Sequence, residues 1–154
     1  MSEQHSSEAR LIRCVMSREG SKSVGLGSDM IAGFSIFESI EAPFMAGGLT
    51  ISDSKNFINE YPIQGGETVN LELKNTFSDI PIEYSLVVAR IGLRQIEGKK
   101  QLYTLVLVSP EMLVNESIQV QDPLEGNPET IVEKMLGKEY LNSSKEFFSE
   151  PSRF

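Results

Sequence analysis

The clearest hydrophobic pattern in the chain is the strict alternation of apolar and polar side chains over residues 67–74. Val69, Leu71 and Leu73 share one side, and polar or charged residues occupy the other. A period of two is typical of a strand with one buried and one exposed face. This segment therefore predicts a half-exposed strand, entered through a turn at Gly65 and Gly66.

The other strongly apolar segments also predict strands. In the first of them, Ile12, Cys14 and Met16 are expected on one side and Leu11 and Val15 on the other. In another, Phe37 and Ile40 also fit a helical turn, but the alternation favours a strand. The predicted strands are 9–16, 31–40, 49–52, 84–91 and 101–108.

The connections between these strands are polar. Residues 17–29 concentrate Ser, Gly and charge without a period, which predicts a loop or a long hairpin tip. The last two strands are separated by a polar stretch containing residues 97–100, a composition typical of a hairpin connection.

Signals for a short helix occur at three places in the sequence. Ser52 or Asp53 can accept from the free N–H groups of a turn that contains Phe57 and Ile58 and stops at Pro62. A cap residue followed by proline occurs at residues 109–110 and again at residues 127–128, and this order is typical of a helix start.

Together these elements predict an α+β chain, rich in strands, with one or two flanking short helices. At 154 residues and 40% apolar content, one hydrophobic core is expected. The expected organisation is a flexible amino terminus at 1–7, a single β-rich domain at 8–142, and a tail or the start of a following segment at 143–154.

The balance of acidic and basic residues disfavours one class of function. The chain has 14 Lys and Arg against 22 Asp and Glu, a net charge of −8 that repels phosphate and argues against nucleic-acid binding. No apolar stretch long enough for a membrane span and no signal peptide is present in the sequence, so synthesis in the host cytoplasm is expected.

The residues offer little for catalysis. His5 is the sole histidine and Cys14 the sole cysteine, so a Ser-His-Asp triad or a multi-histidine metal site cannot be built within one chain. No cofactor and no metal is expected. An enzyme that uses Glu38 or Asp53 in a cleft is one hypothesis, and it requires a carboxylate with a strongly shifted pKa.

Some large apolar residues lie where contact surfaces often form. The candidates for an assembly interface are Phe44, Met45, Leu49 and Ile51, after a proline bend, and Phe147 and Phe148, in the tail. For the first four residues the alternative, packing in the core, is the favoured interpretation.

The order and spacing of three segments resemble those in a known protein family. The segments FSIFESIEAPFMAGGLTISDSKNFINEYPIQGGETVNLELK, YTLVLVSPEMLVNE and NPETIVEKML follow one another as in the amino-terminal part of the T4-like phage baseplate central hub protein. The resemblance covers residues 31 to 141. It implies a tail-tube-type β-barrel, a trimeric pseudo-sixfold ring between tail tube and central spike, and a place in the virion. DNA would pass through the lumen without being bound.

On the matching positions, the resemblance implies that Asp53 caps the short helix, that Pro62, Gly65 and Gly66 shape its exit, and that Glu67 opens the next strand. Proteins of this family are longer and contain two tube-like domains. The chain is therefore expected to be a fragment of a hub, or a reduced relative that closes a ring as six copies or with a partner.

A competing hypothesis is a small monomeric binding or adaptor module without catalysis. In it, the 17–29 loop and the 97–100 hairpin would be recognition elements on a stable barrel.

Overall fold

A computed structural model describes residues 9–75, 80–98, 100–121 and 123–148 of the chain. The chain divides into two compact units, one ending at Ser109 and the other beginning at Pro110. The described part of the chain contains no helix with the length and apolarity that crossing a membrane requires.

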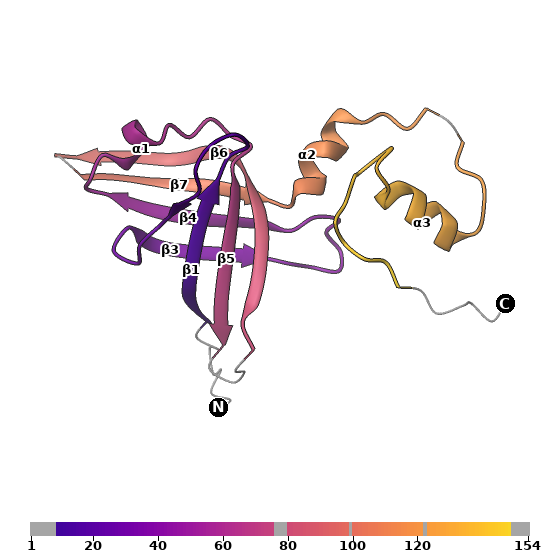
Figure 1. Cartoon of the computed structure of the whole chain (residues 1–154), viewed down its shortest axis with the longest axis horizontal. Coiled ribbons are helices and arrows are strands. Elements are labelled where there is room, and N and C mark those ends of the chain that lie inside the picture. The colour runs from indigo at the N-terminus through magenta and orange to yellow at the C-terminus, as the bar shows by residue number, and fades with distance from the viewer. Residues whose placement is uncertain (1–8, 76–79, 99, 122, 149–154) are drawn as a thin grey trace. The chain divides into compact units, whose positions relative to one another are not determined.

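Seven antiparallel strands of the first unit form one curled sheet in the order β2-β1-β5-β6-β7-β4-β3. Figure 1 shows the strands around β1 and β5 crossing those around β7 and β4, so that the sheet folds over onto itself as a half-barrel. The strands are β1 (Ala9–Ser17), β2 (Val24–Gly25), β3 (Ile31–Phe37), β4 (Ala46–Asp53), β5 (Thr68–Asn75), β6 (Ile82–Glu97) and β7 (Lys100–Val108). The predicted strand-rich α+β class is confirmed, with 44% strand and 16% helix.

The long strand β6 connects the two layers. Its first part pairs with β5 and its later part with β7, and Val87 pairs with both neighbours. Two bulges, between Val88 and Arg90 and between Ile91 and Arg94, interrupt its register with β7. An extra residue at a bulge bends a strand and increases its twist. The strand continues to Glu97, whereas the sequence predicts its end at Ile91. The prediction ends too early because the bulges break the alternation that marks a strand in sequence.

In β1, a bulge changes which side chains share a face of the strand, so the prediction for Ile12 is wrong. The register with β5 shifts between Leu11 and Arg13. Cys14 and Met16 are buried as predicted, but Ile12 is 50% exposed. The shift rotates the side chains before it relative to those after it, so Ile12 does not share the face of Cys14. Burial raises the pKa of the Cys14 thiol to about 11.

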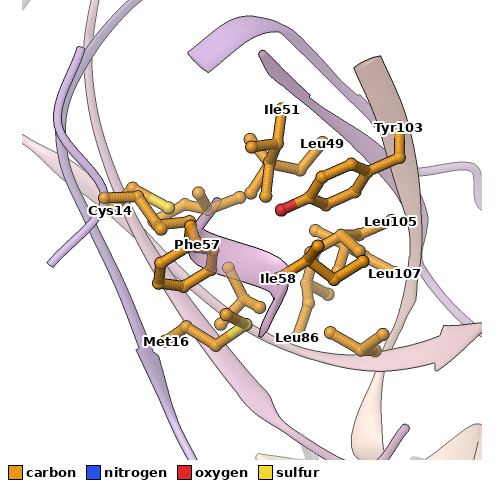
Figure 2. Packing of buried hydrophobic residues seen from close by; sticks show 14 residues of the cluster. Cys14, Met16, Leu49, Ile51, Phe57, Ile58, Leu86, Tyr103, Leu105 and Leu107 are labelled. Carbon is orange, nitrogen blue, oxygen red and sulfur yellow. The ribbon is translucent and has the colours of Figure 1, made fainter. Parts of the chain in front are cut away.

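The core lies inside the curl of the sheet and takes residues from both layers. The short helix α1 (Phe57–Glu60) covers it with Phe57 and Ile58. In Figure 2 these two side chains project into the cluster formed by the strand residues. The fully buried apolar residues, all at 0% exposure, are Met16, Leu49, Ile51, Val69, Leu86, Val88, Tyr103, Leu105 and Leu107.

The uncertain segment 31–40 is a strand only as far as Phe37. A tight turn follows, in which the Ala42 N–H donates to the Ser39 carbonyl at 3.2 Å. No helix forms over residues 31–40, so the helical alternative for Phe37 and Ile40 is wrong.

The 17–29 segment contains the two-residue strand β2, which pairs with Val15 and Met16.

The second unit contains the two helices that the proline signals predict, α2 (Pro110–Ser117) and α3 (Pro128–Leu136). The Asn127 side chain caps α3 by accepting from the Thr130 N–H at 2.9 Å. Within the same unit the buried Glu111 accepts from the Ser143 hydroxyl at 2.7 Å and from the Lys145 ammonium at 3.3 Å. Burial opposes ionisation of Glu111, but these donors outweigh it and hold its pKa below the usual range.

Candidate assembly surface

The structure separates the predicted interface residues into buried and exposed ones. Leu49 and Ile51 are 0% exposed, because they occupy inward-facing positions of β4. Met45 is partly buried against the core. Phe44 is half-buried. Leu49 and Ile51 are therefore core residues, as the alternative interpretation had it, and are not surface positions of this chain.

Phe147 and Phe148 lie in the second unit, after its last helix. Phe147 is 36% exposed and Phe148 is 83% exposed. A phenylalanine as exposed as Phe148 is unusual on a soluble surface, and such residues mark contact sites when they cluster. The pair stays a candidate for contact with another molecule.

The sheet has an uncovered edge at β3. Among the described residues, β3 pairs with β4 along one side and with no strand along the other. An edge of this kind presents a row of unpaired N–H and C=O groups, which natural proteins usually protect with charged residues or proline. The sequence of β3, IAGFSIF, contains neither; a bulge between Ile31 and Gly33 is its one irregularity.

The edge strand leads into an exposed apolar turn. Phe37 is 67% exposed, and Ile40 is fully exposed, at 104%. The turn is fixed locally, because the Ser39 hydroxyl accepts from the Glu41 N–H at 3.2 Å. Glu38 and Glu41 are exposed beside these apolar residues. Phe37, Glu38, Ile40 and Glu41 are called the loop patch below.

A second exposed apolar group lies at the tip of the β6–β7 hairpin. Leu93 and Ile96 are each 65% exposed. Arg94 and Lys100 are exposed in the same part of the hairpin. The Arg94 guanidinium donates to the Gln101 side-chain oxygen at 2.8 Å. Glu97, which pairs with Lys100, is exposed there too. Leu93, Arg94, Ile96, Glu97 and Lys100 are called the hairpin patch below.

Sequence reasoning missed Phe37, Ile40, Leu93 and Ile96 as surface candidates. A signal for Phe37 was present, because it directly follows Ile36 and so points to the opposite face of the strand. For Leu93 no signal existed, because its exposure depends on the bulge between Ile91 and Arg94.

The turn before β5 is fixed by a buried carboxylate. Glu67 is 0% exposed and accepts from the Gln64 N–H at 2.8 Å, the Gly65 N–H at 2.9 Å and the Arg18 guanidinium. Burial opposes ionisation of Glu67, but these three donors outweigh it and hold its pKa below the usual range. This arrangement ties the start of the 17–29 segment to the turn, which is a scaffold role.

The Gly65 and Gly66 backbone completes this turn. Their φ angles are +95° and +84°, a left-handed region that favours glycine. The Gly66 N–H donates to the Val88 carbonyl at 2.8 Å, which joins the turn to β6. Glu67 lies immediately before β5, which begins at Thr68.

Asp53 caps α1 through both of its carboxylate oxygens. It accepts from the Phe57 N–H at 2.9 Å, the Ile58 N–H at 3.0 Å and the Lys55 N–H at 3.1 Å, and it is 0% exposed. Backbone donors therefore occupy the carboxylate that the enzyme hypothesis would use as a base. Glu38, the other carboxylate of that hypothesis, is exposed. The described residues contain no cluster of three or more His, Cys, Asp or Glu able to hold a metal ion.

A small groove lies between β1 and β3. Its volume is about 250 Å³, and its apolar lining includes Leu11, Cys14, Leu26, Ile31 and Phe34. Arg13, which is exposed, lies at the same groove. A groove of this size suits one or two apolar side chains of a bound segment.

No protein-family model matches the chain, and no curated protein matches it at a significant level.

Proposed function

We propose that this chain is a non-catalytic structural protein of a contractile phage tail, which joins tail tube to central spike by forming part of the baseplate hub ring. The proposal combines the resemblance of residues 31 to 141 to the T4-like hub family with the curled antiparallel sheet. The observation that carries it is the uncovered edge of β3, which lacks charge and proline and ends in the exposed Phe37.

An uncovered edge strand tends to acquire a partner. A strand with free backbone groups and an apolar end binds another strand or aggregates unless a partner covers it. A ring supplies that partner to each copy, because every copy covers the edge of its neighbour. In this proposal the half-barrel becomes part of a tail-tube-type barrel only within a trimeric or hexameric ring.

The net charge of −8 suits a conduit for DNA. An acidic wall repels the phosphate backbone, so DNA passes through the lumen without being held. In this role the protein is part of the virion and needs no cofactor.

The groove between β1 and β3 favours a second candidate function. A monomeric adaptor would bind an extended apolar segment of a partner in this groove and against the free edge of β3. The two functions differ in the mass of the purified protein.

The first test measures assembly mass by light scattering at several protein concentrations. We expect a trimer or a hexamer, and electron microscopy of the same sample should show rings. A strict monomer at every concentration would contradict ring assembly and leave the adaptor function.

Two variants locate the contact. Phe37→Thr removes the exposed aromatic side chain at the end of β3 and is expected to reduce assembly, because the apolar contact is lost. Ile82→Thr makes a similar change at an isoleucine that is 47% exposed, away from β3, and should leave the mass unchanged. Equal effects of both variants would count against the β3 edge.

A shortened chain ending at Glu146 tests the tail residues. It removes Phe147 and Phe148 but keeps Ser143 and Lys145, the partners of the buried Glu111. A loss of assembly in this shortened chain would assign the contact to the tail phenylalanines.

A further inference from the structure

The groove between β1 and β3 lies where two strands lack a neighbour. Because β2 pairs with β1 only at Val15 and Met16, residues 9–13 have no strand on that side in the described part of the chain. The outer side of β3 has no described partner either. Figure 1 shows β1 and β3 running in different directions, so an extended segment bound in the groove can follow only one of them. The edge of β3 is free along the whole strand and is the one that such a segment can follow.

The inside of the groove is apolar. Its apolar lining residues are Leu11, Ile12, Cys14, Leu26, Ile31 and Phe34. An extended segment that adds to a free strand edge gains affinity from main-chain hydrogen bonds and specificity from side chains that enter such pockets. A segment that fits this groove therefore has a large apolar side chain and an unpaired main chain.

A single charged residue, Arg13, is among the described residues that line the groove. Glu72 and Glu83 follow Arg13 in one row across β5 and β6, on the side of β1 away from β3. Neither forms an ion pair with Arg13 in the described part of the chain. Between β2 and β3, Asp29 is already bound by the Lys55 ammonium at 2.9 Å. A carboxylate that enters the groove therefore meets Arg13 on its unoccupied side.

The last described residues of the chain have the features that the groove requires. Phe148 is 83% exposed, and within the described ranges the main chain of residues 146–148 forms no hydrogen bond. Lys145 is bound by the buried Glu111, which leaves Glu146 as the unpaired charge beside the phenylalanines. The sequence after Phe148 adds one glutamate and one arginine, whose charges cancel. Residues 146–148 are called the end segment below.

Alternation in an extended chain fixes which side chains of the end segment act together. Successive side chains of a strand point to opposite sides, so Glu146 and Phe148 share one side and Phe147 takes the other. Insertion of Phe148 into the groove therefore directs Glu146 to the same side, where the long side chain of Arg13 can reach its carboxylate.

We propose that the end segment of one copy binds the groove of the next copy, with its main chain along the free edge of β3 and Phe148 between β3 and β1. This inference rests on the proposed function, because it names how one copy covers the β3 edge of its neighbour. Phe148 is exposed in the single chain, which leaves it free to bind a second copy. The contact joins two different surfaces, and a contact of this heterologous kind gives rings when the rotation closes.

Two single substitutions disable the two sides of the contact separately. Phe148→Ser removes the inserted side chain, whereas Ile12→Glu introduces a carboxylate into the apolar groove. We expect each change to weaken self-association by about tenfold or more, measured by light scattering over a series of concentrations. Circular dichroism of both variants should match that of the original chain, because Ile12 is 50% exposed and Phe148 is 83% exposed.

Each variant has a matched control. Phe147→Ser makes the same change at the neighbouring residue, whose side chain points away from the groove in the bound segment. Ile82→Glu makes the same change at an isoleucine of similar exposure, 47%, that does not line the groove. Both controls should keep the assembly mass of the original chain.

Mixing the two disabled proteins tests whether the contact joins different copies. Phe148→Ser keeps an intact groove, and Ile12→Glu keeps an intact end segment. Each should be monomeric alone, and an equimolar mixture should form one-to-one pairs that grow no further, because each pair has used its one intact groove and its one intact end segment. A mixture that remains monomeric would overturn the proposed contact, and it is the result expected if the end segment binds the groove of its own chain.

Exchange of charge tests the predicted pairing of Glu146 with Arg13. R13E and E146R should each weaken self-association by about threefold to tenfold, because like charges then meet across the contact. R13E/E146R should recover the original association. Repulsion between the new glutamate of R13E and Glu72 of the same copy is not relieved by E146R, so recovery reports on the contact between copies.

The outcomes separate this contact from ring assembly itself. If the original chain is monomeric at every concentration, ring assembly and the contact are both wrong. If the original chain assembles and the Phe148→Ser and Ile12→Glu variants assemble equally well, ring assembly stands and the contact of the end segment with the groove is overturned.

Discussion

At the scale of single residues, Glu67 is a buried carboxylate that accepts from two backbone N–H groups and from the Arg18 guanidinium. Glu67→Gln should lower the free energy of unfolding by about 2 kcal/mol, because the amide leaves Arg18 without its carboxylate and sets a donor against backbone donors. Urea unfolding measures the change. The control Glu60→Gln alters an exposed glutamate of α1 and should change stability by no more than about 0.5 kcal/mol.

The same carboxylate makes stability depend on pH. Its folded pKa lies below the ordinary value of 4.5, so its stabilisation is present above pH 4.5 and is lost as the pH falls through the folded pKa. The original chain should lose stability on acidification below this value, and Glu67→Gln should lose less. Parallel curves for the two proteins would show that Glu67 contributes nothing to the acid sensitivity.

A substitution at Tyr103 is expected to raise the free energy of unfolding, whereas Glu67→Gln lowers it. Tyr103 is 0% exposed, and no described residue forms a hydrogen bond with its hydroxyl. Figure 2 shows this oxygen directed into the apolar cluster. Burial, with the charge of Asp53 adding to it, raises the pKa of Tyr103 far above its usual value. Tyr103→Phe should therefore stabilise the protein by about 1 kcal/mol in thermal or urea unfolding, and a clear loss of stability would reveal a partner for the hydroxyl.

At the scale of elements, the sequence predicts the regular parts and misses the irregular ones. The strand β5 was predicted almost to the residue, because an uninterrupted alternation encodes it. Proline and cap residues located α2 and α3. The ends of β6 and the facing of β1 could not be predicted, because bulges arise from pairing with another strand and leave no period in the sequence.

For the candidate assembly surface, too, the sequence predicts the regular positions and misses those that depend on turns and bulges. Leu49 and Ile51 alternate, which already favoured burial, and they are core residues. The exposure of Ile40 depends on the Ser39 turn, and that of Leu93 depends on a bulge. The charge of each patch is visible in the sequence, but their positions at opposite ends of one layer follow only from strand pairing.

The pairing of β3 with β4 depends on a close approach at Gly47. A Cβ atom there would lie 2.7 Å from the Ser35 carbonyl oxygen and 3.6 Å from a Leu86 methyl group. Gly47→Ala should therefore destabilise the protein by about 1–3 kcal/mol, because the backbone of β3 must shift. Gly33→Ala in β3 is the matched control, because in the described part of the chain a Cβ there has no neighbour within 4 Å. Thermal unfolding of both variants measures the difference.

At the scale of the whole molecule, net charge gives a direct prediction about DNA. A chain with a net charge of −8 should not bind duplex DNA even at about 0.05 M salt, because repulsion is least screened there. Fluorescence anisotropy of a labelled duplex measures this. The original chain should leave the anisotropy unchanged. Micromolar binding by the original chain would contradict the conduit role.

The order of strands in the sheet has a consequence for how the chain folds. The neighbours β5, β6 and β7 follow one another in sequence and can pair as soon as short turns close, whereas β1 must find β5 across the whole of β2, β3, β4 and α1. Closing long loops is entropically costly, and folds dominated by distant pairings reach the native state in about milliseconds to seconds. The β5–β6–β7 meander is therefore expected to form in the folding transition state, with β1 docking late. Until it docks, the backbone N–H and C=O groups along one side of β5 lack a partner strand, and this interval is the time at which the newly made chain is most prone to aggregate.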